Sequence, residues 1–410
     1  MKLPSDNGFL AASEVIQKLI AGGFRALLAG GCVRDMLLGR TAQDYDVATS
    51  ATPKDVRRLF PRARMVGAKF GVVLVRRRKH DIEVATFRRD GVYTDGRHPD
   101  KITFGGERDD ALRRDFTING MFLDLSSLEV IDHVGGMDDI DAGIVRTIGH
   151  PERRFAEDYL RLLRAPRFAA RLGFSIEADT RDAIIRLGKN LRYISPERVW
   201  MELQQLLTSP SRGRGFGLVH ELGLVRHLSG EMILTDKQCE LVAKILGVFD
   251  APVIDPALAM AAVLHELSRN VARDVCRSLR MSNRITDDVL WLLSSLEFAR
   301  RSGTLQLADF KQLMAHRRWD SLLSLLQAKL IAENADLSPY DTLIRRAGMI
   351  APQSVAPPPL LRGDQLIELG ADPGPRFGEI LKTVYRAQLN EEITTIGDAR
   401  ILAASLLREK

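Results

Sequence analysis

The chain is poor in cysteine, and its few cysteines are scattered. The 410 residues include three cysteines, Cys32, Cys239 and Cys276. Such wide spacing excludes a disulfide-dense secreted scaffold and a zinc site built on paired cysteines. We therefore expect reduced thiols packed in the core of a cytoplasmic protein.

Long apolar runs are absent as well. No stretch approaches the ~18 consecutive apolar residues of a membrane-spanning helix, so we expect no membrane partner. The first seven residues lack the basic flank and apolar core of a signal peptide. Aromatic residues make up only 6% of the chain, fewer than RNA binders that rely on base stacking would use.

The remaining composition is that of an ordinary globular protein. Hydrophobic residues account for 45% and charged residues for 27%, and the length suffices for two to four domains. The net charge of +6 permits a nucleic-acid partner without establishing one.

A glycine turn stands near the N-terminus. The apolar run Ala26 to Ala29 predicts a buried strand, Gly30 and Gly31 interrupt it, and Val33 to Leu38 predicts a helix ending at Gly39. Without side chains, the two glycines let backbone N–H groups approach an anion, and the start of a helix favours negative charge. The turn therefore predicts a phosphate-binding site.

Two carboxylates follow this turn. Asp44 and Asp46 stand at positions i and i+2, which face the same side of a strand. They repel each other unless a cation lies between them, so the pair predicts a divalent metal that holds a nucleoside triphosphate. Asp81 and Glu83 share one face of a later alternating strand, and the alternation alone favours a solvent-facing pair.

The stretch from Gly30 to Arg40, followed by Asp44-Tyr45-Asp46, resembles the signature of class II nucleotidyltransferases. These are the tRNA CCA-adding enzymes and bacterial poly(A) polymerases of the polymerase β superfamily. The resemblance implies a two-metal mechanism with Mg²⁺ on Asp44 and Asp46. It also implies a third catalytic carboxylate, Glu83 or else Asp81.

Two further motifs resemble the same family. In Asp110 to Met121, Arg114 would carry charge toward the triphosphate. In Phe155 to Phe168, Glu157, Asp158, Arg161 and Arg164 follow the spacing of one helical face, which alone indicates stabilising ion pairs. The resemblance makes this segment the nucleotide-selecting motif. We expect Pro166 to kink this helix one turn past Arg161 and to displace Arg167. In full, the resemblance assigns nucleotide binding to Gly30, Gly31, Arg34, Asp35, Arg114, Asp158, Arg161, Arg164 and Arg167.

The polar loop from Arg89 to Asp100 bears on which nucleotides are added. The resemblance ties a loop of this length to enzymes that add the terminal A, and not to relatives that add only C. We expect an α+β fold, a small mixed-sheet nucleotidyltransferase head followed by an all-α neck, body and tail. The expected bounds are 1–150 for the head, 151–215 for the nucleotide-selecting neck, 216–350 for the body and 351–410 for a tRNA-binding tail.

The resulting prediction is template-independent addition of CMP and AMP to tRNA 3′ ends, with tRNA, CTP and ATP as partners. Two rivals are an A-adding-only tRNA nucleotidyltransferase and a poly(A) polymerase. Against the latter, Val66 to Phe70 lacks the paired basic residues of similar poly(A) polymerases. A third rival, a non-catalytic RNA-binding protein, is disfavoured by the joint presence of Asp44, Asp46 and Glu83. The sequence leaves full CCA addition versus A-only addition, the identity of the metal and the oligomeric state open.

Overall fold

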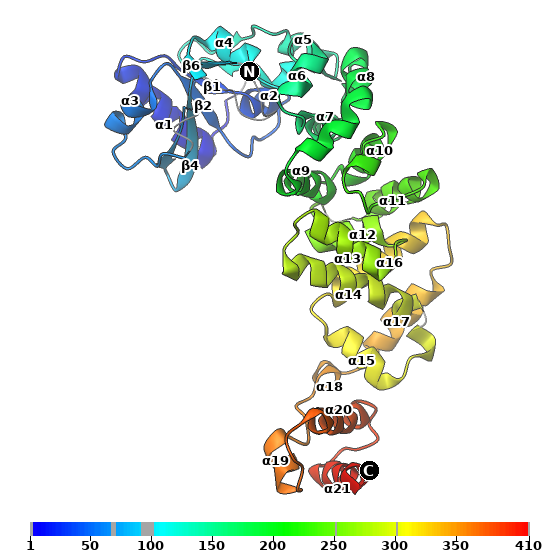
Figure 1. Ribbon diagram of the computed structural model, residues 1–410. Coiled ribbons are helices and arrows are strands. Elements are labelled where there is room, and N and C mark those ends of the chain that lie inside the picture. The colour runs from blue at the N-terminus through cyan, green and yellow to red at the C-terminus, as the bar shows by residue number, and fades with distance from the viewer. Residues whose placement is uncertain (1–2, 67–70, 92–101, 251, 301, 409–410) are drawn as a thin grey trace. The chain divides into compact units, whose positions relative to one another are not determined.

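The computed structural model describes residues 3–66, 71–91, 102–250, 252–300 and 302–408. The chain divides into two compact units, Met1–Leu234 and Thr235–Lys410 (Figure 1). The first unit combines a sheet with helices, and the second is built of helices in its described residues. The predicted α+β class is confirmed.

A six-stranded sheet with the order β3-β4-β2-β1-β7-β8 organises the start of the first unit. Its strands are β1 (Ala26–Ala29), β2 (Asp46–Thr49), β3 (Val72–Arg77), β4 (His80–Thr86), β7 (Phe122–Leu123) and β8 (Val130–Ile131). Only β2 and β4 pair in parallel, and the other neighbours are antiparallel, so the sheet is mixed as predicted. The buried strand expected at Ala26–Ala29 is confirmed.

Helices pack on the sheet through apolar faces. Helix α1 (Asn7–Ala21) contacts β1 to β4 (Figure 1) and buries Val15 and Ile16 there. The predicted start of α3 (Pro53–Leu59) is confirmed, since Thr52 caps it in a capping box with Asp55. On the sheet's other face, α4 (Glu107–Leu112) adds Ala111 to a buried cluster. These contacts leave the carboxyl end of β1 and the start of β2 open to the pocket described below.

Shorter elements complete the head and lead into helices. These are α2 (Gly31–Leu37), β5 (Arg88–Asp90), β6 (Ile102–Phe104), the 3₁₀-helix η2 (Thr117–Asn119), α5 (Gly136–Asp141), β9 (Ile144–Val145), α6 (Pro151–Glu157), α7 (Arg161–Leu172), β10 (Ser175–Ile176), α8 (Ala178–Leu187), the 3₁₀-helix η3 (Gly188–Tyr193), α9 (Pro196–Thr208), α10 (Arg212–Glu221) and the 3₁₀-helix η4 (Val225–His227). Helix α2 begins two residues earlier than the sequence predicts. The parallel pair β9–β10 is a short strand contact that the helical pattern beyond Pro151 did not predict.

The continuous helix predicted over Phe155 to Phe168 is wrong. Helix α6 ends at Glu157, Asp158 takes an extended conformation with φ −156°, and α7 begins at Arg161. The break precedes Pro166, which lies buried inside α7 without ending it. Consequently Glu157 and Asp158 do not share one helical face with Arg161 and Arg164.

The second unit contains α11 (Asp236–Val248), α12 (Pro256–Leu264), α13 (Arg269–Ser278), α14 (Asn283–Arg300), the 3₁₀-helix η5 (Ser302–Thr304), α15 (Leu307–Ala315), α16 (Trp319–Ala332), α17 (Ser338–Gly348), α18 (Pro352–Val355), α19 (Gly363–Glu368), α20 (Pro375–Leu389) and α21 (Ile396–Arg408). The nearly all-apolar α12 is buried against α14 and α16. Helices α19 to α21 share a separate apolar cluster that includes Leu366, Val384 and Ala399.

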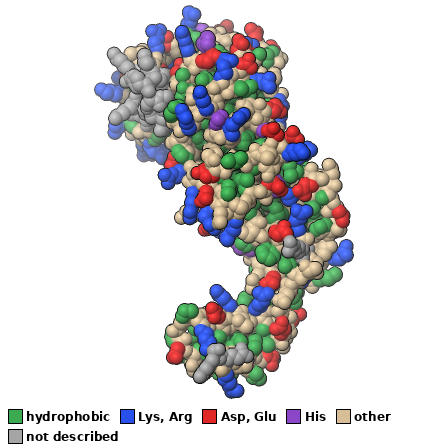
Figure 2. All heavy atoms as spheres, turned by 45° about the vertical axis from the view of Figure 1, so that its right-hand side comes forward, with side chains coloured by type: hydrophobic (Ala, Val, Ile, Leu, Met, Phe, Trp, Pro, Cys, Tyr) green, Lys and Arg blue, Asp and Glu red, His purple; other side chains and the backbone are tan. Residues whose placement is uncertain are grey.

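The described residues bear on three features of the sequence, namely its cysteines, its apolar runs and its charge. All three cysteines are free and buried. No described helix has the length and apolar character needed to cross a membrane. On the face of the molecule seen in Figure 2, Lys and Arg side chains mix with Asp and Glu instead of forming one basic patch, which agrees with the modest net charge.

Candidate active site

A pocket of about 530 Å³ lies in the first unit, between the sheet and the helices that follow it. Every residue predicted to be catalytic or nucleotide-binding lines it, except Arg167 and the alternative carboxylate Asp81. Residues from 29 to 198 therefore converge on one cavity. The sheet side carries the glycine turn and the carboxylates, and the helical side carries Asp158, Arg161, Arg164 and Arg198.

Strand register explains how the carboxylates meet the glycine turn. Ala29 of β1 pairs with Asp46 of β2, so Gly30 follows directly beside this carboxylate. Val47 pairs with Val84 in the parallel contact of β2 with β4, which sets Asp46 next to Glu83. Asp44 lies two residues before the strand and also lines the pocket. Asp81, in contrast, is bound by Arg64 at 2.7 Å and does not line the pocket.

Gly30 is required by the geometry of the turn. Its φ is +73°, and a Cβ built there would lie 2.7 Å from Nη1 of Arg114. Arg114 is fixed by two contacts: Nη2 donates to Oδ2 of Asp110 at 3.0 Å, and Nη1 donates to the Asn119 carbonyl at 3.2 Å. The absent side chain thus lets a guanidinium approach the backbone of the turn.

The carboxylates Asp44 and Glu83 repel that of Asp46, which is itself buried. Burial raises the pKa of Asp46 to about 6, and the charges of Glu83 and Asp44 add to this effect against the opposing charge of Arg114. Burial also raises the pKa of Glu83 despite nearby arginines. Oxygen ligands crowded in this way suit a hard divalent cation. In the described part of the chain no group of three or more His, Cys, Asp and Glu side chains is placed to hold a metal ion, although Asp44, Asp46 and Glu83 all line this pocket.

Arg34 and Asp35 form a buried pair behind the turn. The Arg34 guanidinium donates from Nε and Nη2 to Oδ1 of Asp35, at 2.9 and 2.7 Å, and from Nη1 to Oδ1 of Asn119. Arg171 of α7 reaches the other oxygen of Asp35 at 3.2 Å. Helix α7 is therefore tied to the wall of the pocket.

A second buried network joins Asp115 to helices α7 and α9. Arg164 donates to Oδ2 of Asp115 from Nε at 2.8 Å and approaches Glu202 at 3.4 Å. Burial alone would raise the pKa of Asp115, but the charges of Arg164 and Arg161 hold it well below its usual range. Arg167 donates to Glu202 at 2.7 Å and stacks on Phe168, which explains why it lies outside the pocket lining.

Asp158 has a partner that the motif did not predict. Arg198, at the start of α9, donates two hydrogen bonds to it at 3.2 and 2.7 Å. The Asp158 carboxylate also accepts from the backbone N–H of Leu160 at 3.1 Å, which stabilises the break between α6 and α7. Arg198 stands 40 residues from Asp158, and we found no local sequence signal for the pair.

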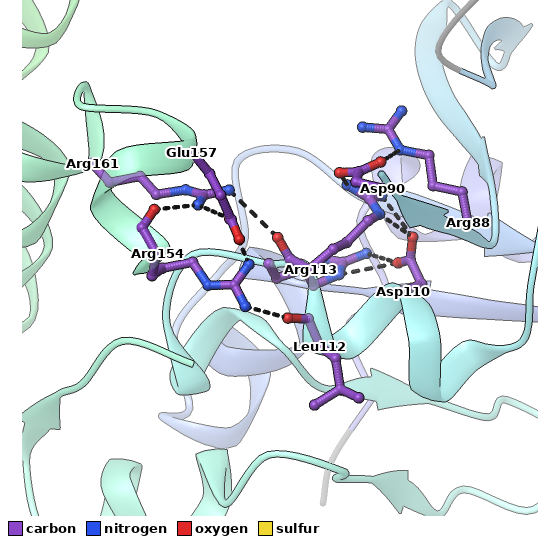
Figure 3. Close-up of polar contacts among 9 residues, drawn as sticks. Arg88, Asp90, Asp110, Leu112, Arg113, Arg154, Glu157 and Arg161 are labelled. Carbon is purple, nitrogen blue, oxygen red and sulfur yellow. Dashed lines mark hydrogen bonds and ion pairs between the residues drawn. The ribbon is translucent and has the colours of Figure 1, made fainter. Parts of the chain in front are cut away.

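Arg161 is bound to a different carboxylate. Its Nη1 donates to Oε2 of Glu157 and to the Arg154 carbonyl, both at 2.6 Å. Figure 3 shows how this cluster continues into the head: Arg161 reaches the Arg113 carbonyl, and Arg154 reaches the Leu112 carbonyl at 2.5 Å. The Arg113 guanidinium in turn binds Asp110 at 2.6 Å.

The cluster in Figure 3 also reaches the hairpin of β5 and β6. Asp90 binds Arg88 at 2.9 Å and lies 3.9 Å from Arg113. The structure assigns Arg88–Asp90 to a strand, so the polar loop predicted from Arg89 begins two residues later. Its positions 92–100 lie outside the described residues, as do positions 67–70 of the segment compared with poly(A) polymerases.

Comparisons with known proteins agree with this geometry. Residues 26–146 match a family model described as the poly A polymerase head domain, and residues 173–232 match a probable RNA and SrmB-binding site of polymerase A. A CCA-adding enzyme of Geobacillus stearothermophilus is 34% identical over 388 residues, 94% of each chain. The chain belongs to the class II tRNA nucleotidyltransferases.

Other members of this family are similar to a comparable degree. Poly(A) polymerase I of Salmonella typhi is 33% identical, covering 89% of this chain and 86% of the relative. The crystal structure of the Bacillus stearothermophilus CCA-adding enzyme in complex with CTP superposes with a TM-score of 0.81, at 32% identity and 98% coverage of both chains. A Thermotoga maritima CCA-adding enzyme complexed with tRNA has a TM-score of 0.68 at 18% identity, a likeness of fold. Nucleotidyltransferases of this superfamily typically use a divalent metal, and the carboxylates in the pocket lining are ligands of the kind that such a metal needs.

Proposed function

We propose that this chain adds CMP and AMP to the 3′ end of tRNA, using CTP and ATP and releasing pyrophosphate. The observation that carries this proposal is the convergence on one pocket of the glycine turn, the carboxylates Asp44, Asp46 and Glu83, and the arginines of α7 and α9. Relatives named as CCA-adding enzymes span nearly the whole chain. Poly(A) polymerase is the second candidate, favoured by the similarity to the Salmonella typhi enzyme and by the match to the poly A polymerase head-domain model.

In this proposal Asp44 and Asp46 hold Mg²⁺, with Glu83 as the third catalytic carboxylate. When bound, the metal lowers the pKa of the terminal ribose hydroxyl and neutralises triphosphate charge. The register of β2 with β4 supports Glu83 over Asp81, since Asp81 is engaged by Arg64.

The triphosphate would lie along Gly30, Gly31, Arg34, Asp35 and Arg114. A guanidinium gives phosphate oxygens paired donors in a fixed plane. Arg114 already holds Asp110 and the backbone of Asn119, so its orientation is set before the nucleotide arrives. Asp35 would position Arg34, to which it is bound, and not touch phosphate itself.

Base choice would depend on Asp158 and Arg161. Cytosine and adenine each present an amino donor beside a ring-nitrogen acceptor, whereas uracil and guanine present a carbonyl beside an N–H donor. A carboxylate accepts and a guanidinium donates, so the two side chains together match C and A. Arg198 would hold Asp158 and Glu157 would hold Arg161 in place. Arg164 would support the neck, and we assign Arg167 a role through Glu202.

We also propose that the expected head (1–150), neck (151–215), body (216–350) and tail (351–410) act as functional parts, the tail binding tRNA. The separate apolar cluster of α19 to α21 supports a distinct tail. The reduced, buried thiols support a cytoplasmic location.

One assay tests the activity and separates its alternatives. The purified chain is given tRNA ending at the discriminator base, at C or at CC, with CTP and ATP singly and together. Stepwise C, C and A addition that then stops is the expected result. Addition only to tRNA ending in CC indicates an A-adding enzyme, and long A tails indicate a poly(A) polymerase.

A further inference from the structure

Two tyrosines, one half-buried and one exposed, form an aromatic pair next to residues of the pocket lining. The rings of Tyr159 and Tyr193 lie 6.2 Å apart, centre to centre, at 37°. Tyr193, the last residue of η3, is 63% exposed. In a chain with only 6% aromatic residues, a paired and mostly exposed ring is a specific feature of this surface.

The position of the pair ties it to the reaction. Tyr159 lies in the break between α6 and α7, and its neighbours Asp158 and Leu160 both line the pocket. Neither tyrosine ring belongs to the described lining of that pocket. The incoming nucleotide would occupy the pocket, and Tyr159 adjoins two of its lining residues without lining it.

Arg192 adds positive charge beside the second ring. Its guanidinium lies 4.8 Å from the centre of the Tyr193 ring, and Nη2 donates to the Tyr193 hydroxyl at 2.8 Å. Across the described ranges no carboxylate lies within ion-pair distance of Arg192. Its charge therefore stays available for a phosphate.

We propose that Tyr159, Tyr193 and Arg192 form a stacking platform for the unpaired 3′-terminal base of the RNA primer. Unpaired bases stack on aromatic rings and on arginine planes regardless of sequence, and arginine also attracts the adjoining phosphate. An enzyme that extends a growing end meets a different terminal base at each step, so a sequence-tolerant surface suits it. This inference rests on the proposed function, because it places the primer of that reaction.

Steady-state kinetics of Tyr193→Ala test the platform. Loss of one stacking partner should raise the KM for tRNA ending in an unpaired C by about 5- to 100-fold. The KM for CTP should change by less than about twofold, because neither ring lines the pocket. Tyr193→Phe should behave as wild type, and Tyr193→Leu, apolar but not planar, should behave as Tyr193→Ala.

Ile185 provides the matched control. It is a half-exposed apolar side chain, 48% accessible, on the neighbouring helix α8, and Ile185→Ala should leave both KM values unchanged. Thermal melting of each variant checks that the neck stays folded. If Tyr193→Ala does not fold, the comparison of Phe with Leu at the same position carries the test.

A binding assay without turnover separates the platform from the activity. A tRNA that ends in a fluorescent cytosine analogue should be quenched by wild type and by Tyr193→Phe, but not by Tyr193→Leu. Quenching by a wild-type chain that adds no nucleotide would refute the proposed function and leave the platform standing. Normal addition with equal quenching by all variants, or a raised KM for CTP alone, would overturn the platform.

Discussion

Replacing Arg198 by Ala tests whether the neck selects bases through a positioned carboxylate. The substitution removes both hydrogen bonds that Arg198 donates to Asp158, at 3.2 and 2.7 Å, and leaves Asp158 with the backbone of Leu160. Freed from Arg198, the carboxylate can rotate, and its acceptor oxygens no longer meet the amino group of C or A in one orientation.

The size of the effect follows from the exposure of the pair. Charge-assisted hydrogen bonds contribute ~1.5–3 kcal/mol. The Arg198 and Asp158 side chains are 22% and 19% exposed, so solvent screening lowers the free energy that their contact contributes to about 1–2 kcal/mol. That range corresponds to a roughly 5- to 30-fold loss of preference for C and A over U and G.

Single-nucleotide addition with each of the four triphosphates measures this preference as a ratio of kcat/KM values. Arg198→Lys, which keeps the charge but not the paired donors, should fall between wild type and Arg198→Ala. Arg198→Glu should lose addition most, since it repels Asp158. If Arg198→Ala slows all four nucleotides equally and keeps the preference for C and A, the pair only supports the fold of the neck.

Three further outcomes follow from the pocket. Asp46→Ala should abolish nucleotide addition while the circular dichroism spectrum and the melting temperature hold, because it also removes repulsion; near-normal turnover at saturating Mg²⁺ would contradict the metal role. Gly30→Ala should lower the free energy of unfolding, measured by urea titration, more than Gly39→Ala does, and it should also raise the KM for CTP more. Both glycines have positive φ, but only at Gly30 would the added Cβ meet Arg114. Affinity for tRNA should fall steeply with salt and vary little among tRNA sequences in filter binding, because backbone phosphates dominate it; a flat salt profile would argue against backbone recognition.

The sequence predicted correctly those elements whose formation depends on residues only a few positions apart. The buried run at Ala26–Ala29 and the Thr52 cap are confirmed because burial and capping are set within a few residues. Asp44 and Asp46 both line the pocket as the spacing suggested, but the strand alternation expected to bring them together is wrong, because β2 begins only at Asp46.

The helix break at Asp158 could not be predicted in this way. The segment from Glu157 to Arg161 contains neither glycine nor proline, so propensity favours an unbroken helix. The structure ends the helix because Asp158 is held by Arg198, 40 residues away, and accepts from Leu160. The helical face predicted from spacing was therefore wrong, although Asp158, Arg161 and Arg164 all reach the pocket.

Counting arginines in the neck overstates the charge that is left for RNA. The segment 151–215 includes Arg153, Arg154, Arg171, Arg181 and Arg186, whose number alone would suit an RNA phosphate backbone. In the structure Arg154 is held by Glu157, Arg171 by Asp35, and Arg186 by Glu152. Within the described ranges, Arg153 and Arg181 have no carboxylate at ion-pair distance, and both are exposed. An arginine already paired releases little further free energy on meeting a phosphate, because it must first leave its carboxylate. Among these pairs, Arg171 joins α7 to Asp35 of α2 across 136 positions of sequence. RNA affinity then depends on the cations that the fold leaves unpaired.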